Sequence, residues 1–310
     1  MERAREEKLH NTQNVNVELP VTVKDLLEAG VHFGHKRRRW NPKMKSFIFT
    51  ERNKIHIIDL RRTMELLQVA YSKVRDVSSK GGKILFVCTK KQGKDGVKQE
   101  AERAGVFYMV ERWPGGTLTN FDTIRSRVEY MKDLERMKED GTLDKYPKKE
   151  QMKMLKELEK LEKVFGGIKD MTSLPDLIYI VDIVQEDIAL KEAKKLGIPV
   201  VAIVDTNADP TVVDYPIPGN DDAIRSINLI TKVIADAVIE GRQGKDFMVA
   251  EKEFEEKEEK VEEVMEEKEV KEEVEEKEEV EEKKEEEKKV ETKEEEKEDK
   301  EKEEQENQEG

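Results

Sequence analysis

The residues most suited to chemistry lie close together near the N-terminus, in the segment HFGHKRRRWNPKMK at positions 32–45. Six cations surround one tryptophan there, and the pair Asn41-Pro42 predicts a turn. The cations are Lys36, Arg37, Arg38, Arg39, Lys43 and Lys45, and the tryptophan is Trp40. Cations neutralise phosphates and an indole ring stacks on bases or riboses, so the segment is typical of an RNA-binding loop. A solvated basic loop with Trp40 packed into the core has the same composition, and both interpretations stay open.

Two further groups of basic and aromatic residues follow apolar runs. Lys90 and Lys91 come directly after the run 83–89, and Arg112 and Trp113 come after the run 106–110. If these runs are strands, their carboxyl ends lie at the sheet edge where open α/β sheets bind ligands. The pair Gly115-Gly116 would let the backbone approach a partner closely, although the same segment can simply be a loop that leads into a helix. Three such segments at one edge favour RNA contact.

One group of side chains could bind a metal ion. Asp205 ends an apolar run, Asp221 and Asp222 open the last predicted helix, and His35 follows the first helix. One imidazole with carboxylates suits zinc or another divalent ion. Alternatively, the aspartates cap the helix and a turn, and His35 contacts RNA or a carboxylate directly. We favour this second interpretation.

The motifs of the common enzyme classes are absent from the sequence. It contains no GxxxxGK[ST] phosphate loop, no GxGxxG fingerprint and no GxSxG nucleophile elbow. Cys88, the single cysteine, lies within an apolar run and is expected to be a buried thiol. The segment DTNADP begins like a calcium loop but has Pro210 where glycine is needed and Pro216 where glutamate is needed. We therefore predict a protein that is not an enzyme and requires no cofactor.

The charge of the chain is divided unevenly. The 310 residues include 72 acidic and 58 basic side chains, a formal charge of −14. Residues 251–310 hold 33 acidic and 14 basic side chains, which leaves the first 250 residues with a charge of +5. A single cysteine, a charged N-terminus and no apolar stretch near about 18 residues predict a cytoplasmic protein without a membrane partner.

The elements that must position these residues are those of an α/β fold. Continuous apolar runs at 83–89, 106–110, 176–182 and 200–205 alternate with amphipathic helices. Such runs indicate strands that are covered on both faces, so we predict a parallel sheet of about five strands with helices on both sides. Before it, the pattern predicts a helix that Thr22 caps, two short β-rich runs at 46–50 and 54–59, and a long helix that ends at Gly81-Gly82.

Other parts of the chain have different patterns. Residues 121–166 carry apolar side chains at spacings of three and four on either side of a turn, which predicts an antiparallel helical hairpin, or short coiled coil. Residues 1–20 are expected to be a flexible extension, and residues 243–310 a disordered tail rich in Glu and Lys. The α/β core would then comprise residues 21–120 and 167–242.

Long strings of the sequence resemble one family over residues 21–242. They include AGVHFGHKRRRWNPKMKSFIF (29–49), RWPGGTLTNF (112–121), LPDLIYIVD (174–182), KLGIPVVAIVDTNADP (195–210) and IPGNDDAIRSI (217–227). The chain is identified by them as similar to bacterial small-subunit ribosomal protein two. The resemblance implies a flavodoxin-like α/β domain with an inserted helical hairpin.

The resemblance also implies a function. Members of this family are non-catalytic, are bound to the ribosome, contact small-subunit (16S) rRNA and neighbouring small-subunit proteins, and help to dock the largest of these, which captures mRNA. Carried over by position, the loop from Lys36 to Lys45, the pair Lys90-Lys91 and the pair Arg112-Trp113 become candidate RNA contacts. The face around His35, Asp205, Asp221 and Asp222 becomes a candidate protein interface.

Overall fold

The computed structural model describes residues 19–244. They belong to one compact unit, Met1–Asp246. The expectations for the N-terminal extension, 1–20, and for the acidic tail, 243–310, therefore lie outside the described residues, except for two residues at the inner end of each.

A parallel five-stranded sheet forms the centre of the fold. Its strands are β4 (Ile84–Val87), β5 (Phe107–Met109), β6 (Leu177–Val181), β7 (Val200–Val204) and β8 (Tyr215–Pro218). They lie in the order β5-β4-β6-β7-β8, and every neighbouring pair is parallel. This is the flavodoxin-like order 2-1-3-4-5. Every residue of β4, β6 and β7 is buried, which explains their continuous apolar runs and confirms the predicted fold class.

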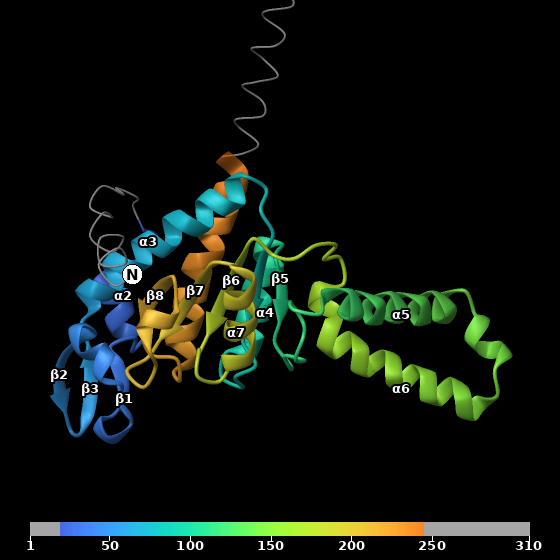
Figure 1. The fold of residues 1–310 in the computed structure, drawn as a ribbon, viewed down its shortest axis with the longest axis horizontal. Helices are drawn as coiled ribbons and strands as arrows, with labels where there is room; N and C mark the ends of the chain where they lie inside the picture. The colour runs from blue at the N-terminus through green and yellow to red at the C-terminus, as the bar shows by residue number, and fades with distance from the viewer. Residues whose placement is uncertain (1–18, 245–310) are drawn as a thin grey trace, which may run out of the picture. The chain divides into compact units, whose positions relative to one another are not determined.

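Helices cover both faces of this sheet (Figure 1). Those on the first face are α3 (Leu60–Ser79), α4 (Lys94–Ala104) and a helix over residues 224–244, and on the second face lies α7 (Asp187–Leu196). The strand register sorts the core, because Phe86, Tyr179 and Val201 align side by side and pack with the first set of helices. Leu85 and Ile178, which precede Phe86 and Tyr179 in their strands, face the second side of the sheet, where α7 lies. Within residues 19–244, none of the helices has the length and hydropathy needed to cross a bilayer.

Strand β8 is an element that the apolar pattern does not reveal. Its sequence, YPIP, contains Pro216 and Pro218. Proline lacks the N–H that a central strand must donate, so it is tolerated at a sheet edge, which is where β8 lies. The Thr63 hydroxyl of α3 donates to the Pro218 carbonyl at 2.7 Å and fixes the end of the strand.

A second, antiparallel sheet precedes α3. It comprises β1 (Phe33–Lys36), β2 (Ile48–Arg52) and β3 (Ile55–Ile58) in the order β1-β3-β2. The two predicted β-rich runs correspond to β2 and β3, whose turn places Asn53 and Lys54 at positive φ, as a two-residue hairpin turn requires. The segment 32–45 differs from the loop that we expected. It begins with β1 and continues through two short 3-10 helices, η1 (Arg37–Arg39) and η2 (Pro42–Phe47).

Two helices follow β5 before the chain returns to the sheet at β6. They are α5 (Phe121–Glu139) and α6 (Lys148–Phe165), which run side by side in opposite directions (Figure 1). Their buried residues, among them Met131, Leu158 and Phe165, belong to the apolar cluster on the second face of the sheet. At the return, a Cβ atom on Gly167 would lie 2.2 Å from the Tyr108 carbonyl oxygen, so only glycine allows this close approach to β5.

The first helix, α2 (Val23–Glu28), begins where the sequence predicts. The Thr22 side chain accepts from the Asp25 amide, and the Asp25 carboxylate accepts from the Thr22 amide in return. This is a capping box, and it fixes the start of the helix just before β1.

Candidate functional site

Strand β1 is held against the end of β7, and this contact positions His35. The His35 amide donates to the Thr206 hydroxyl at 2.8 Å, and the Asn41 amide donates to the Thr206 carbonyl at 2.7 Å. A Cβ atom on Gly34 would lie 2.6 Å from the Thr206 methyl group, so glycine at this position permits the approach. His35 therefore lies at the carboxyl end of the parallel sheet although it belongs to the other sheet.

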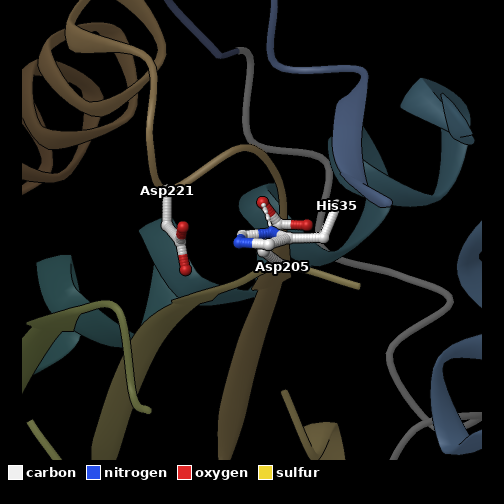
Figure 2. A group of neighbouring side chains, drawn as sticks. All are labelled: His35, Asp205 and Asp221. Atoms are coloured by element: carbon white, nitrogen blue, oxygen red, sulfur yellow. Dashed lines mark ion pairs between the residues drawn. The ribbon is translucent and has the colours of Figure 1, made fainter. Parts of the chain in front are cut away.

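His35 lies between two buried carboxylates (Figure 2). Its Nδ1 is 3.0 Å from Asp205 Oδ2, and one ligand atom each of His35, Asp205 and Asp221 lies within 4.8 Å of the others. Asp205 and Asp221 are each 1% exposed, and Asp221 Oδ2 has no hydrogen-bond partner among residues 19–244. The sheet topology thus brings together three of the four residues that the sequence predicted as metal ligands.

Asp222, the fourth, lies at the rim. Its Oδ2 is 3.4 Å from His35 Nε2, but its side chain is 55% exposed. Within residues 19–244 no backbone amide donates to Asp221 or Asp222, so neither caps the last helix, and Asn220 accepts from the amides of Asp222 and Ala223 in the turn before it. The direct His35–carboxylate contact agrees with our favoured interpretation, whereas neither Asp221 nor Asp222 has the predicted capping role.

Lys90 differs from its expected place on the surface. It is buried, and its ammonium lies 2.8 Å from Asp221, 2.7 Å from Asp222 and 2.9 Å from Asp182. Three carboxylates surround this charge, so it is not available to a phosphate, and we leave Lys90 out of the RNA contacts proposed below. Its neighbour Lys91 is exposed.

The protonation behaviour of the group follows from this crowding. The close contact with the Asp205 carboxylate raises the pKa of His35 against the effect of burial, and the charges of Asp205, Asp221 and Asp222 raise it further. Burial, with the charges of Asp205 and Asp182, raises the pKa of Asp221 to about 7 despite Lys90. Four carboxylates thus share one ammonium and one imidazole, an arrangement that favours an additional cation. An imidazole and two carboxylates form a donor set that fits zinc, with one position left for another ligand.

A basic surface lies on the antiparallel sheet and the short helices beside it. Arg37, Arg38 and Arg39 are exposed on η1. Next to them is a hollow of about 810 Å³, lined by Lys36, Arg37, Arg38, Trp40, Glu51 and Lys54. Glu51 and Lys54 carry no binding motif in the sequence, and the β2–β3 hairpin brings them beside the segment 36–40. The only sequence signal that could have placed Glu51 and Lys54 beside this segment is a two-residue hairpin turn at Asn53-Lys54.

Other predicted contacts in this segment are partly engaged within the protein. The Trp40 ring is half-buried and lies 5.2 Å from the His56 ring. The Lys43 ammonium contacts Asp209 at 2.6 Å, and the Arg37 guanidinium lies 3.6 Å from Glu51. Lys45 is exposed. Lys36, Arg38, Arg39 and Lys45 are exposed and have no ion pair with a carboxylate within residues 19–244, so they offer the free charges of the segment.

Arg112 and Trp113, which follow β5, lie in different environments. Arg112 is exposed, whereas Trp113 is buried and its indole N–H donates to Glu192 at 3.2 Å. Glu192 also accepts from the amides of Gly116, Leu118 and Thr119, so one carboxylate of α7 organises the whole loop. Trp113 is thus a core residue and not an exposed stacking platform. Strands β4 and β6 lie between this loop and the residues around Thr206, so the predicted contacts form two surfaces.

Comparisons with known proteins agree on one family. Residues 26–241 match the model of the family described as Ribosomal protein S2. A relative, the small ribosomal subunit protein uS2 of Coprothermobacter proteolyticus, is 56% identical over 230 residues, which cover 74% of this chain and 86% of the relative. The family match includes the basic surface and the group around His35.

Proposed function

Because the chain belongs to the ribosomal protein S2 family, it is a structural protein of the small ribosomal subunit that acts in translation and is not an enzyme. On this premise we propose that it binds small-subunit (16S) rRNA, mainly through phosphates. The proposed contacts are Lys36, Arg37, Arg38, Arg39, Lys45, Lys91 and Arg112, with Trp40 and Lys43 at the margin of the basic surface.

The observation that carries this proposal is the exposed row Arg37–Arg39 beside the basic hollow. The row lies in a 3-10 helix, whose three residues project in different directions and can reach different phosphates. Arginine suits this role because its planar guanidinium can hold a phosphate through two hydrogen bonds. Since the exposed cations outnumber the aromatic residues here, phosphate contact outweighs base stacking.

Charge reversal tests the proposal. Replacing Arg37, Arg38 and Arg39 by Glu should strongly reduce incorporation of the protein into small subunits, measured by competition with the wild-type chain. The matched control reverses three exposed cations of α7, at Lys191, Lys194 and Lys195. Equal incorporation of the two variants would count against the basic surface as the RNA contact.

A second proposed function is protein docking through a bound divalent ion. His35, Asp205 and Asp221 would hold the ion, and a partner would complete its shell. Val184 and Ile224, which are 54% and 56% exposed, follow Asp182 and Asp222 by two residues and provide apolar area beside this group. In this family the partner would be the largest small-subunit protein, which binds mRNA.

A pull-down with that partner tests the docking proposal. The Asp205→Asn and Asp221→Asn variants should each lose the partner, and a chelator should release it from the wild-type chain. The Asp187→Asn variant, which alters an exposed acid at the start of α7, should retain it. Retention by all variants and in chelator would refute docking through the ion.

We further propose that residues 121–166 are an insertion into a core of residues 21–120 and 167–242.

A further inference from the structure

A small hollow lies where the strand order of the parallel sheet reverses. β4 and β6 are neighbours in the sheet, but the chain leaves them in opposite directions, toward β5 and toward β7. At their carboxyl ends is a hollow of about 240 Å³, lined in part by Thr89, Arg112, Trp113, Gln185 and Glu186. We call it the switch-point pocket. Such reversals are where open α/β sheets bind their ligands.

Glu186 forms the polar inner wall of the switch-point pocket. It is 3% exposed, and its Oε1 accepts from both the amide and the hydroxyl of Thr89 at 2.6 Å. Both of these bonds go to Oε1, and no donor within residues 19–244 contacts the other oxygen, Oε2. Burial raises the pKa of the Glu186 carboxyl, against the two hydrogen bonds from Thr89. The carboxylate would therefore gain from one or two further donors.

Asp182 fixes the turn that positions Gln185 and Glu186. Asp182 has a positive φ, and its Oδ1 accepts from the amides of Val184 and Gln185, so the chain turns sharply after β6. The turn brings the Gln185 side-chain amide to the Thr89 hydroxyl, at 3.0 Å. The Gln185 carbonyl oxygen is left as a second acceptor beside Glu186.

The remaining walls have a different character. Arg112 is exposed and adds a positive charge, while Glu111 is already paired with Lys94 at 2.9 Å. Trp113 and Ile188 contribute apolar surface. The pocket thus combines hydrogen-bond acceptors, apolar walls and a guanidinium. A lysine or arginine side chain from a protein partner fits poorly, because Arg112 would repel it.

We propose that the switch-point pocket binds a single unpaired guanine of RNA, whose N1–H and N2–H₂ donate to Glu186 while Arg112 contacts its phosphate. Guanine suits this wall because it carries two adjacent donors on its Watson–Crick edge, the edge that proteins read in single-stranded RNA. The volume is below the range of about 300–1,000 Å³ for drug-sized ligands, so the pocket suits one planar ring system. This inference rests on the proposed RNA-binding function and specifies one of its contacts.

Titration of the full 310-residue chain with guanosine 5′-monophosphate tests the proposal. The indole N–H resonance of Trp113 reports on the pocket wall, and that of Trp40, the other tryptophan, reports separately on the basic surface. Guanosine monophosphate should shift the Trp113 signal with a Kd in the millimolar range, about tenfold tighter than the adenosine, cytidine and uridine monophosphates. No shift of Trp113, or an equal response to all four nucleotides, would overturn the proposal.

Three variants assign the contacts. Glu186→Gln keeps an acceptor for Thr89 but presents donors to the base, so the preference for guanine should disappear. Arg112→Gln should weaken binding of guanosine monophosphate but not of guanosine, which lacks the phosphate. Glu159→Gln, the matched control at a paired carboxylate of α6 outside the pocket lining, should bind as the wild-type chain does. An unchanged guanine preference in Glu186→Gln would refute the pocket, while salt-dependent RNA binding through Arg37–Arg39 would persist and keep the two proposals separate.

Discussion

The Lys90 ammonium lies 2.8 Å from the Asp221 carboxylate, with 9% and 1% of the two side chains exposed. Asp182 and Asp222 contact the same ammonium. One buried cation thus joins the ends of β4 and β6 to the start of the last helix. Four carboxylates meet here when Asp205 is included. The charge of Lys90 offsets part of their mutual repulsion and so stabilises the group in the absence of any other cation.

Replacing Lys90 by Met should destabilise the protein strongly. Removing one partner from a buried ion pair costs about 3–5 kcal/mol, because the carboxylates lose their compensating charge. Urea unfolding measures the loss. Lys91→Met, at the exposed neighbouring position, should change the free energy of unfolding by less than about 0.5 kcal/mol. Similar stability of the two variants would contradict the role given to Lys90.

The Glu192 carboxylate should make the free energy of unfolding depend on pH in the acid range. Although burial opposes it, the hydrogen bonds from Thr119, Gly116, Leu118 and Trp113 hold the pKa of Glu192 below its ordinary value of 4.5. A carboxyl whose pKa is lower in the folded state stabilises the protein above its unfolded pKa and loses that contribution as the pH falls through its folded pKa.

The corresponding experiment compares the wild-type chain with Glu192→Gln by urea unfolding from pH 6 down to about pH 3. The variant should be less stable at pH 6, and the difference between the two proteins should shrink as the pH falls below about 4.5. Glu111→Gln, which alters an exposed carboxylate, serves as the control. A difference that stays constant over this range would show that Glu192 does not bind the loop through its charge.

Gly34 should be intolerant of a side chain. A Cβ atom there would lie 2.6 Å from Thr206 Cγ2 and 3.1 Å from the His56 carbonyl oxygen, so β1 would have to move away from β7. Gly34→Ala should cost about 1–3 kcal/mol, as overpacking does, and should displace His35. In Gly115→Ala, by contrast, no described atom lies within 4 Å of the new Cβ, and stability should hardly change. Thermal unfolding of both variants decides the point.

Metal binding should depend on the buried members of the His35 group. The full chain, loaded with zinc and passed through a desalting column, should retain about one equivalent, because three protein ligands hold such an ion. Asp221→Asn should lose most of it, and Asp222→Asn should retain it, since Asp222 lies at the rim. Equal zinc content in these two variants and in the wild-type chain, measured by elemental analysis, would dismiss the site.

The sequence predicts those parts of the fold whose pattern has one physical cause. The runs that became β4, β6 and β7 are apolar throughout because both of their faces are buried. Strand β8 could not be found in this way, since its prolines depend on an edge position that only the assembled sheet defines. Strand β1 was hidden because the cations around it suggested a loop.

The candidate site was predictable in its residue types but not in the direction of each side chain. Topology places Asp205 and Asp221 at one edge, and the sequence alone indicated that His35 could join them. Lys90 and Lys91 look equivalent in the sequence, yet one is buried among aspartates and the other is exposed. Trp113 likewise resembles a stacking platform until the distant Glu192 binds its indole. Such contacts join residues about 80 or more positions apart, which no local pattern encodes.

The central claim, that the protein holds rRNA mainly through phosphates at the basic surface, is tested most directly by the salt dependence of its affinity for a small-subunit rRNA fragment. If about six phosphates are neutralised, the logarithm of the affinity should fall against the logarithm of the salt concentration with a slope of roughly −4 to −5. Replacing Arg37, Arg38 and Arg39 by Gln should bring that slope closer to zero by about 2 to 3. A wild-type slope near zero, or a slope that the three replacements leave unchanged, would contradict the claim.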